Sequence, residues 1–402
     1  MTRTVLQGAT VIDGTGAGPA VADVVVSDGR ILDVGVGLDG DEAVDLAGRW
    51  LLPGLIDCHV HVMVSTINLL TAVQTPFSLA FYQAAHNLAA TLRGGVTSVR
   101  DAGGADLGVK EAVARGLVQG PRMHIAVQIL SATGGHGDGW MVCGAHLPFL
   151  GPHPGRPPSV CDGPAEVLRR VREVIRAGAD VVKICTTGGV LSEHDDPQAS
   201  QFLPDEIAVV VAEARAARIG VMAHAQGTDG IKNALRAGVS SIEHGIYLDD
   251  EAIGLMLEAG TFLVPTLLAP IGVLDAPEGV SEASLRKASE VLEIHQASIG
   301  KAAAAGVRIA MGTDSGVIPH GRNAAELREM VKVGMSPMAA VQAATRVAAE
   351  NVGVADRRGT VEPGKDADML AVAGDPLADI EVLADPSNVT GVWLAGDRVV
   401  GA

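Results

Sequence analysis

The sequence predicts an α/β protein, built as a TIM-like (β/α)8 barrel with a small β-sandwich formed by the two ends of the chain. Three observations support this prediction. The chain of 402 residues is longer than the roughly 250 residues that such a barrel needs. Apolar strands alternate with helices through the middle of the chain, as in a closed parallel sheet. Short strands and Gly-rich turns occupy both ends instead.

The two ends of the chain predict the β-sandwich. Short strands broken by Gly and Asp are expected at residues 4–6, 9–12, 21–27, 30–36 and 43–46. Residues 366–402 have the same pattern, and the stretch 389–400 resembles a hairpin. We therefore expect residues 1–53 and 360–402 to form one composite domain, and residues 54–359 to form the barrel.

A weak internal repeat predicts the strands of the barrel. In each copy a helix ends in small residues and Gly, and an apolar strand that closes on a polar residue follows. The copies cover residues 93–101, 176–183, 218–224, 236–244, 258–266 and 305–314, and residues 51–61 and 122–130 supply two further strands. A doubly wound sheet is the rival interpretation, but the count of eight strands favours the barrel.

Composition and charge narrow the class of partner. The 47 acidic and 30 basic residues give a formal net charge of −17. This charge disfavours nucleic acid and anionic membranes, because phosphate contacts need clustered Lys and Arg. Neither an export signal nor an apolar run long enough for a membrane span is visible. We expect a cytoplasmic homo-oligomer that acts on a small-molecule substrate.

The four cysteines are scattered without C-x-x-C spacing, so we expect free thiols in a reducing compartment. Cys58 and Cys185 lie next to candidate ligands. We expect the alternation of side chains along a strand to turn both thiols away from the barrel interior, where they pack and do not bind metal.

Polar side chains at the ends of the predicted strands form the candidate site, because activity in such a barrel lies at the C-terminal ends of its strands. His59 and His61 point to the same face of their strand. Other strands end in Lys183, His224, His244 and Asp314. A single His at a strand end is more often a core residue than a ligand. Their joint placement predicts a metal site, and imidazole with carboxylate ligands favours Zn²⁺.

Several motifs at these positions resemble a known family. They are Pro53-Gly-Leu-Ile-Asp57 followed by His59-Val-His61, Thr133-Gly-Gly-His-Gly-Asp138, Lys183-Ile-Cys-Thr-Thr-Gly-Gly189, His224-Ala225, Ile242-Glu-His244-Gly245 and Gly312-Thr-Asp314. Together they resemble the imidazolonepropionase-like branch of the amidohydrolase superfamily, across essentially the whole chain. Within that branch the chain is most similar to metal-dependent dipeptidases of the Xaa-Pro and Xaa-Arg type and to N-acyl amino acid amidases.

The resemblance implies a role for each candidate ligand. The implied ligands are His59, His61 and Asp314 for a more buried ion, and His224 and His244 for a more exposed one. Lys183 would bridge both ions as a carbamate formed with CO₂, because a free ammonium has only donors and cannot ligate. The alternative is that Lys183 stays a cation paired with Asp314. The resemblance thus implies two divalent metal ions, with Zn²⁺ preferred.

The same resemblance implies hydrolysis of an amide bond by a metal-activated hydroxide. Two cations lower the pKa of bound water and polarise the scissile carbonyl, while Asp314 takes the proton and passes it to the leaving amine. His136, in the glycine-flanked loop after the third strand, is expected to donate to the carbonyl oxygen or to a substrate carboxylate. A hydrogen bond that only folds the loop is the alternative.

Residues that contact substrate are expected in the loops at the same mouth. Segments 131–163 and 266–281 are candidate lids, and Trp140 is a candidate for packing on the substrate. Some relatives carry a Tyr two residues after the strand-five His, where it meets the substrate carboxylate. This chain has Gln226 there, and Tyr247 is the candidate replacement. Because Gln226 replaces this Tyr, the sequence does not determine the leaving group of the substrate.

Three functions stay open at this point. We favour hydrolysis of a dipeptide or an N-acyl amino acid. A cyclic amide, lactam or carbamate hydrolase would use the same activated water in a differently shaped pocket. A scaffold barrel without catalysis is the third alternative, although a scaffold has no reason to keep the complete set of candidate ligands.

Overall fold

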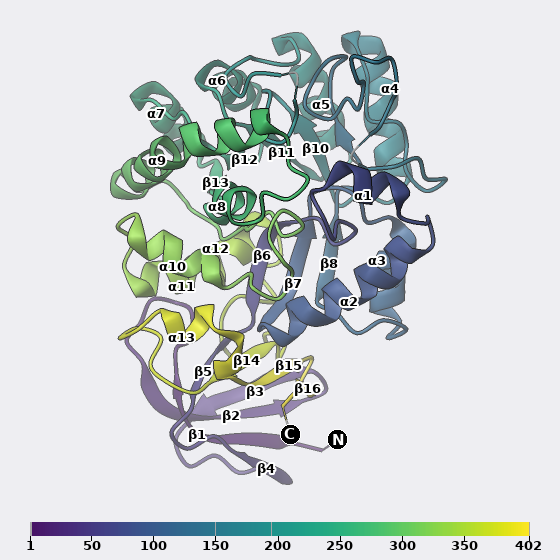
Figure 1. Cartoon of the computed structure of the whole chain (residues 1–402). Coiled ribbons are helices and arrows are strands. Elements are labelled where there is room, and N and C mark those ends of the chain that lie inside the picture. Colours follow the sequence, from purple (N-terminus) through teal and green to yellow (C-terminus); the bar gives the residue numbers. More distant parts are fainter. Residues whose placement is uncertain (1, 149, 194, 402) are drawn as a thin grey trace.

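The computed structural model describes residues 2–148, 150–193 and 195–401. One eight-stranded sheet lies at the end of the molecule that carries both termini (Figure 1). Its strands are β1 (Thr4–Val11), β2 (Ala20–Ser27), β3 (Arg30–Gly35), β4 (Glu42–Asp45), β5 (Trp50–Pro53), β14 (Met369–Val372), β15 (Val389–Leu394) and β16 (Asp397–Val400). They run in the order β16-β15-β14-β5-β1-β2-β3, and β4 pairs with β1. The first and last parts of the chain therefore share one sheet, which includes the predicted hairpin of β15 and β16.

This sheet has an apolar core of its own. Its buried members include Leu6, Val24, Ile31, Leu51, Met369 and Trp393. The register between β1 and β2 shifts between Leu6 and Ala9. Gly8, with φ of 72°, lies at this shift, in a conformation that residues with a Cβ rarely adopt.

Two parallel sheets form the middle of the chain. One contains β6 (Leu55–Val60), β7 (Val96–Asp101) and β8 (Arg122–Ile125), and the other contains β9 (Ile129–Leu130), β10 (Val181–Cys185), β11 (Gly220–Ala225), β12 (Ser241–His244) and β13 (Phe262–Val264). Backbone hydrogen bonds join the two sheets on both sides. Asp180 donates to Ile125 on one side, while Ala310 donates to Leu263 and Cys58 to Met311 on the other. The chain thus has a mixed α/β fold whose parallel strands succeed one another in sequence order.

Two of the predicted strands differ from the expectation. The third, at residues 122–130, is divided into β8 and β9, because Val127 between them has a φ of 67° that no strand accommodates. The eighth, at residues 305–314, is not a regular strand. It makes isolated bridges from Ile309 to Leu263 and from Ser315 to Val60, so it lies between β13 and β6 without a continuous ladder.

Helices follow the parallel strands and cover them on the outside (Figure 1). They are α2 (Leu79–Arg93), α3 (Leu107–Ala114), α4 (Gly163–Arg176), α5 (Pro204–Ala216), α6 (Thr228–Ala237), α7 (Asp250–Ala259), α8 (Leu268–Asp275), α9 (Glu282–Ala305), α10 (Ala325–Lys332), α11 (Pro337–Ala343) and α12 (Arg346–Asn351), with α1 (Leu69–Gln74) before them and α13 (Glu381–Ala384) after them. In three copies of the repeat the glycine is a helix C-cap. Gly238, Gly260 and Gly306 end α6, α7 and α9 with left-handed backbones, which explains why Gly precedes the strand in these copies.

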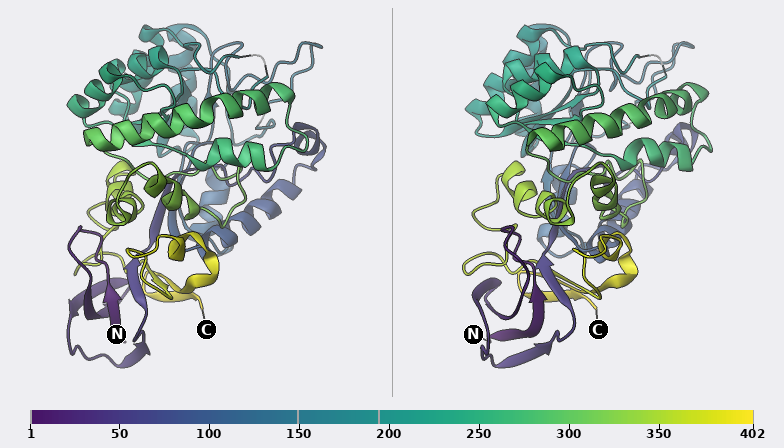
Figure 2. Two further views of the ribbon diagram at one scale, coloured as in Figure 1. Left: turned by 60° about the vertical axis from the view of Figure 1, so that its left-hand side comes forward. Right: turned by 90° about the vertical axis from the view of Figure 1, so that its left-hand side faces the viewer.

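The two predicted lids have different structures. Segment 266–281 contains α8, which packs beside the long helix α9 (Figure 2). The described residues of segment 131–163 form turns and isolated bridges up to the start of α4. A helix that is both long and apolar enough to cross a membrane is not found in the described parts of the chain.

Candidate metal centre

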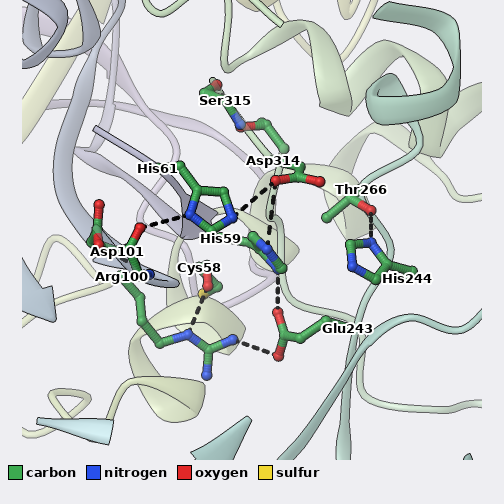
Figure 3. A network of polar contacts seen from close by, with 12 residues as sticks. Cys58, His59, His61, Arg100, Asp101, Glu243, His244, Thr266, Asp314 and Ser315 are labelled. Carbon is green, nitrogen blue, oxygen red and sulfur yellow. Dashed lines mark hydrogen bonds and ion pairs between the residues drawn. The ribbon is translucent and has the colours of Figure 1, made fainter. Parts of the chain in front are cut away.

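Three of the predicted ligands lie together at the centre of the site (Figure 3). The candidate ligand atoms of His59, His61 and Asp314 all lie within 4.8 Å of one another. Nε2 of His59 and Nε2 of His61 lie 3.6 and 3.3 Å from Oδ1 of Asp314. Gly312 lets the segment before Asp314 pack closely between β13 and β6, since a Cβ at that position would lie 2.2 Å from a methyl carbon of Val264 and 3.0 Å from Cβ of His59. Two imidazoles and a carboxylate therefore converge on one point.

Hydrogen bonds fix which ring nitrogen of each histidine faces the centre. Nδ1 of His59 donates to Glu243 at 2.7 Å, and Nδ1 of His61 donates to the carbonyl oxygen of Gly103 at 2.8 Å. Nδ1 of His244 pairs with the Thr266 hydroxyl at 2.7 Å. Nε2 is therefore the nitrogen that each of these rings would offer to a metal ion, which is the usual arrangement of a metal-binding imidazole.

His224 is oriented the other way round. Its Nε2 donates to the carbonyl oxygen of Gly188 at 3.0 Å, so Nδ1 is its available ligand atom. The rings of His61, His59, His244, His224 and His136 form a continuous row, with neighbouring centroids 5.5, 5.1, 4.6 and 4.2 Å apart. The structure thus brings the four predicted histidine ligands and the predicted catalytic histidine to one site.

Lys183 lies in the same site, with a side chain that is 2% exposed. Its Nζ has no hydrogen-bond partner, and no ion pair of Lys183 with Asp314 is formed among the described residues. Burial lowers the pKa of Lys183, because the ammonium loses its hydration. A buried lysine without a partner is costly, so the alternative of a simple Lys183–Asp314 salt bridge does not explain this side chain.

The histidines of the site are suited to coordination. Burial, followed by the charge of neighbouring groups that include Lys183, holds the pKa of His59, His224 and His244 well below the usual range. These rings are therefore neutral near pH 7, which is the form that binds metal. Burial would raise the pKa of Asp314, but His59 and His61 outweigh it and lower that pKa. Asp314 is thus an anion.

Three residues of the site have left-handed backbones that residues with a Cβ rarely adopt. The φ values of His244, Thr266 and Asp314 are 72°, 51° and 59°. Each residue lies directly at or after the end of a strand segment, where the chain turns into a loop. Such strain persists only where the surroundings hold it, and it gathers at functional sites.

Sequence reasoning missed a buried charged network behind the histidines (Figure 3). Arg100 on β7 donates to Glu243 on β12 at 2.8 Å, and its Nε donates to the carbonyl oxygen of Cys58. Glu243 is 0% exposed and also accepts from His59 and Ser241. The sequence does contain a signal for this network, because Arg100 and Glu243 are opposite charges inside otherwise apolar strands. Charges buried in this way are usually paired.

A cavity of about 280 Å³ opens in front of this cluster. All six predicted metal ligands line it, as do His136, Gln226 and Trp140. Trp140 is 52% exposed and lies at the outer part of the cavity wall. Tyr247 is not among the described residues that line the cavity, and its side chain packs against an apolar cluster around Ile246 instead.

One of the two cysteines was misplaced by the alternation argument. Cys185 lines the cavity, because it lies two residues after Lys183 on β10 and so shares its face. Burial raises the pKa of its thiol to about 12, which disfavours the thiolate needed for metal binding. Cys58 lies away from the cavity, with Sγ 3.8 Å from the carbonyl oxygen of Ala348. All four cysteines are free thiols, as expected.

Comparison with known proteins identifies the family. Residues 50–399 match the Amidohydrolase family. The ochratoxinase of Aspergillus niger is 34% identical over 424 aligned positions, which cover 99% of this chain and 87% of that protein. A crystal structure of a prolidase complexed with N-methylphosphonate-L-proline is 38% identical, with a TM-score of 0.93 over 100% of both chains. A Xaa-Pro dipeptidase with methionine bound in the active site is 35% identical, with a TM-score of 0.90 over 99% of this chain and 100% of that one. The chain therefore belongs to the amidohydrolase family and is a hydrolytic enzyme that acts on amide C–N bonds.

Proposed function

We propose that the chain hydrolyses a dipeptide or an N-acyl amino acid at a two-metal centre, held at the strand ends of a closed (β/α)8 barrel. The observation that carries this proposal is Lys183, whose Nζ is buried at the site and has no hydrogen-bond partner among the described residues. A carbamate on Nζ would turn a donor-only group into an anion with two ligand oxygens. That change accounts both for the burial of Lys183 and for the absence of a salt bridge to it.

The donor set fits two borderline divalent ions such as Zn²⁺. His59, His61 and Asp314 would hold one ion, His224 and His244 the other, and Lys183 as a carbamate would bridge them. Bound ions would supply Lewis acidity toward the carbonyl and an activated water. The support for this assignment is that every one of these histidines already has its second ring nitrogen occupied by a hydrogen bond.

The chain's own groups would handle the proton and the substrate. Asp314 is an anion beside His59 and His61, so it can accept the proton of the attacking water and release it to the leaving amine. His136 lines the same cavity and is the candidate that contacts the substrate carbonyl or carboxylate. Gln226 is a second candidate for substrate contact, because it lines the cavity with its Oε1 buried and unpaired.

The choice of substrate class rests on similarity to the prolidase and the Xaa-Pro dipeptidase over nearly the whole chain. Ochratoxinase is similarly close in identity, so an N-acyl amino acid is an equal candidate. The cavity wall supports both, because it is largely apolar and includes Ile129, Met141 and Leu191. A lactam, cyclic amide or carbamate is the alternative substrate for the same chemistry.

Metal analysis with a substrate screen tests this function. The purified protein should contain about two metal equivalents per chain, lose activity on chelation and regain it with Zn²⁺. A library of dipeptides, N-acyl amino acids, lactams and carbamates is assayed for released amine or ring opening. Turnover of lactams alone would overturn the substrate class. A protein with no metal and no turnover would favour the scaffold alternative.

We also propose that residues 1–53 and 360–402 form a domain distinct from the barrel at 54–359, and that the chain is a cytoplasmic homo-oligomer. Self-association is supported by exposed apolar side chains on and beside α1 and α2. They include Leu70, Phe77 and Tyr82, which are 68%, 57% and 76% exposed, and these side chains are candidates for an interface. The free thiols fit a reducing compartment. Light scattering after size-exclusion chromatography measures the oligomeric mass, and a monomer at micromolar concentration would contradict self-association.

A further inference from the structure

The imidazole of His136 lies in a slot between two elements of the site. On one side it stacks on the ring of His224, with centroids 4.2 Å apart and planes inclined by 18°. Gly189 also lies against the ring, since a Cβ at that position would come within 2.2 Å of the His136 imidazole. Only glycine therefore lets the loop after β10 press flat against this imidazole. If the ring tilted, it would lose its stacking on His224 or its contact with Gly189.

Polar contacts then fix the rotation of the ring within its plane. Nδ1 of His136 lies 2.8 Å from the hydroxyl of Ser192 and 3.5 Å from the carboxylate of Asp195. Ser192 in turn donates its one hydroxyl hydrogen to Asp195 or to the carbonyl oxygen of Gly189, and both of these can only accept. Burial opposes ionisation, but the contacts with His136 and Ser192 lower the pKa of Asp195 to about 2, so it stays an acceptor.

It follows that Ser192 accepts a hydrogen bond from Nδ1–H of His136. The remaining ring nitrogen, Nε2, has no hydrogen bond to any other described residue and lies on a ring that lines the cavity. The Ser192–Asp195 pair thus presents Nε2 of His136 to a bound substrate, as an acceptor in the neutral ring and as a donor to a substrate carbonyl or carboxylate in the imidazolium form. This is the arrangement by which a carboxylate sets the tautomer and the direction of a working imidazole.

The loop that carries these groups is held by a buried lysine from another element. Nζ of Lys287, on α9, donates to the carbonyl oxygens of Gly189, Ser192 and Asp195 at 2.7, 2.5 and 3.0 Å. An ammonium has three hydrogens, so these contacts use its whole donor capacity. Nζ also lies 3.4 Å from the Asp195 carboxylate. Lys287 is 7% exposed, and a charged group is buried so deeply only when it is fully paired.

We propose that Ser192, Asp195 and Lys287 are positioning residues of the hydrolase, which hold His136 against His224 with Nε2 directed at the substrate. The inference rests on the proposed function for its kinetic consequences, but the positioning itself is a statement about geometry. The same loop supplies the carbonyl oxygen of Gly188 that orients His224. Lys287 therefore connects the candidate catalytic histidine and a candidate metal ligand through one segment.

The kinetic test is a set of double-mutant cycles. Lys287→Met, Asp195→Asn and Ser192→Ala should each lower kcat/KM about 10- to 100-fold, as is typical when a residue that orients a working group is removed. In a His136→Ala background Ser192→Ala and Asp195→Asn should change kcat/KM less than about twofold, because there is no imidazole left to position. Lys287→Met should lose less than in the wild-type background, but it keeps the part of its effect that passes through Gly188 and His224. Equal losses for Ser192→Ala and Asp195→Asn in both backgrounds would overturn the proposal, since they show an effect that does not pass through His136.

Matched controls separate positioning from stability. Lys110→Met removes a partly buried lysine that also pairs with an aspartate. Its partner is Asp180, at 2.6 Å, and both residues lie outside the cavity lining. This substitution should leave kcat/KM unchanged, while melting temperatures of all variants are compared. Ser192→Ala is the mildest change and keeps the test open if Lys287→Met does not fold.

A structural readout makes the inference independent of turnover. Crystal structures of the Ser192→Ala and Lys287→Met proteins should show the His136 ring turned away from His224. An unchanged ring in both would overturn the positioning role even in an active enzyme. If the wild-type protein cleaves no amide in the screen, the proposed function fails, yet a displaced ring in these variants would still support the positioning role.

Discussion

Glu243 accepts a 2.7 Å hydrogen bond from Nδ1 of His59, and both side chains are at most 1% exposed. The carboxylate is itself held by Arg100 at 2.8 Å. This contact decides which nitrogen of His59 faces Asp314, and it raises the ability of that nitrogen to donate to a metal ion. The geometry of the candidate metal centre therefore depends on a carboxylate that never reaches the cavity.

Replacement of that carboxylate is the first prediction. Glu243→Gln should weaken metal binding by about 10- to 100-fold, because a neutral amide holds the imidazole less firmly and polarises it less. Competition with a chromophoric chelator measures the affinity. Glu206→Gln is the control, since Glu206 is a buried glutamate as well. It lies at the start of α5 and accepts hydrogen bonds from backbone N–H groups. Equal metal affinity of the Glu243→Gln and Glu206→Gln proteins would show that Glu243 does not support metal binding.

The second prediction separates ligand from substrate contact within the row of imidazoles. His136→Ala should keep its metal and lower kcat/KM by about 2–4 kcal/mol of transition-state binding, because a hydrogen-bond partner in a dry site is worth that much. His244→Ala should lose metal, because its Nε2 is one of the available ligand atoms. Elemental analysis and steady-state kinetics of the two proteins decide the matter. Metal loss in His136→Ala would make the loop histidine a ligand.

The parts of the site that could be predicted are those set by local rules. The repeat places Gly at a helix end and a polar residue at a strand end, and both follow from backbone geometry within about ten residues of sequence. His59, His61, Lys183 and His224 could therefore be assigned, and the structure brings them to one cavity. The same rule was applied wrongly to Cys185, which shares the face of Lys183.

The parts that could not be predicted depend on contacts between distant segments. Lys287 holds the loop at Gly189 across 98 positions of sequence, and Arg100 reaches Glu243 across 143. Nothing local to these residues distinguishes a buried charge from a solvated one. Tyr247 was assigned to the cavity by its distance from His244 alone. The chain turns through a left-handed His244 before it, so strand alternation no longer gives its direction.

The third prediction concerns the stability of the metal-free protein. Burial lowers the pKa of His295 and of His320 from 6.5 to about 4. Between pH 6.5 and about pH 4 these two histidines bind more protons in the unfolded chain than in the folded protein. The free energy of unfolding therefore falls as the pH falls. Each histidine should therefore lower the free energy of unfolding by about 2 kcal/mol between pH 7 and pH 5, given about 1.36 kcal/mol per pKa unit.

Single substitutions isolate each contribution from opposing groups such as Asp57, whose pKa burial raises to about 6. Urea unfolding of the metal-free protein is measured at pH 7, 6 and 5. His320→Gln and His295→Gln should each reduce the loss between pH 7 and pH 5 by about 2 kcal/mol. His86→Gln, at an exposed position of α2, should leave the loss as in the wild type. Parallel curves for all four proteins would contradict the prediction.

The last prediction tests Lys183 as a carbamate. Two divalent ions about 3.5–4 Å apart repel strongly and need an anionic bridge. An ammonium between them would add to that repulsion. Lys183→Ala should therefore lose at least one metal equivalent and nearly all activity. Lys183→Arg should fare no better, because guanidinium is a permanent cation that cannot ligate.

Chemical rescue distinguishes a missing bridge from a damaged fold. The Lys183→Ala protein has a cavity where the side chain was, and formate, acetate or propionate can enter it and supply two oxygens. Activity should return partly when both Zn²⁺ and a small carboxylic acid are added, and neither alone should suffice. His244→Ala is the control. It lacks an imidazole ligand, which a carboxylic acid does not replace, so the acids should not restore its activity. A Lys183→Arg protein with normal metal content and near-normal turnover would rule out the carbamate, and the two-metal assignment would have to be abandoned with it.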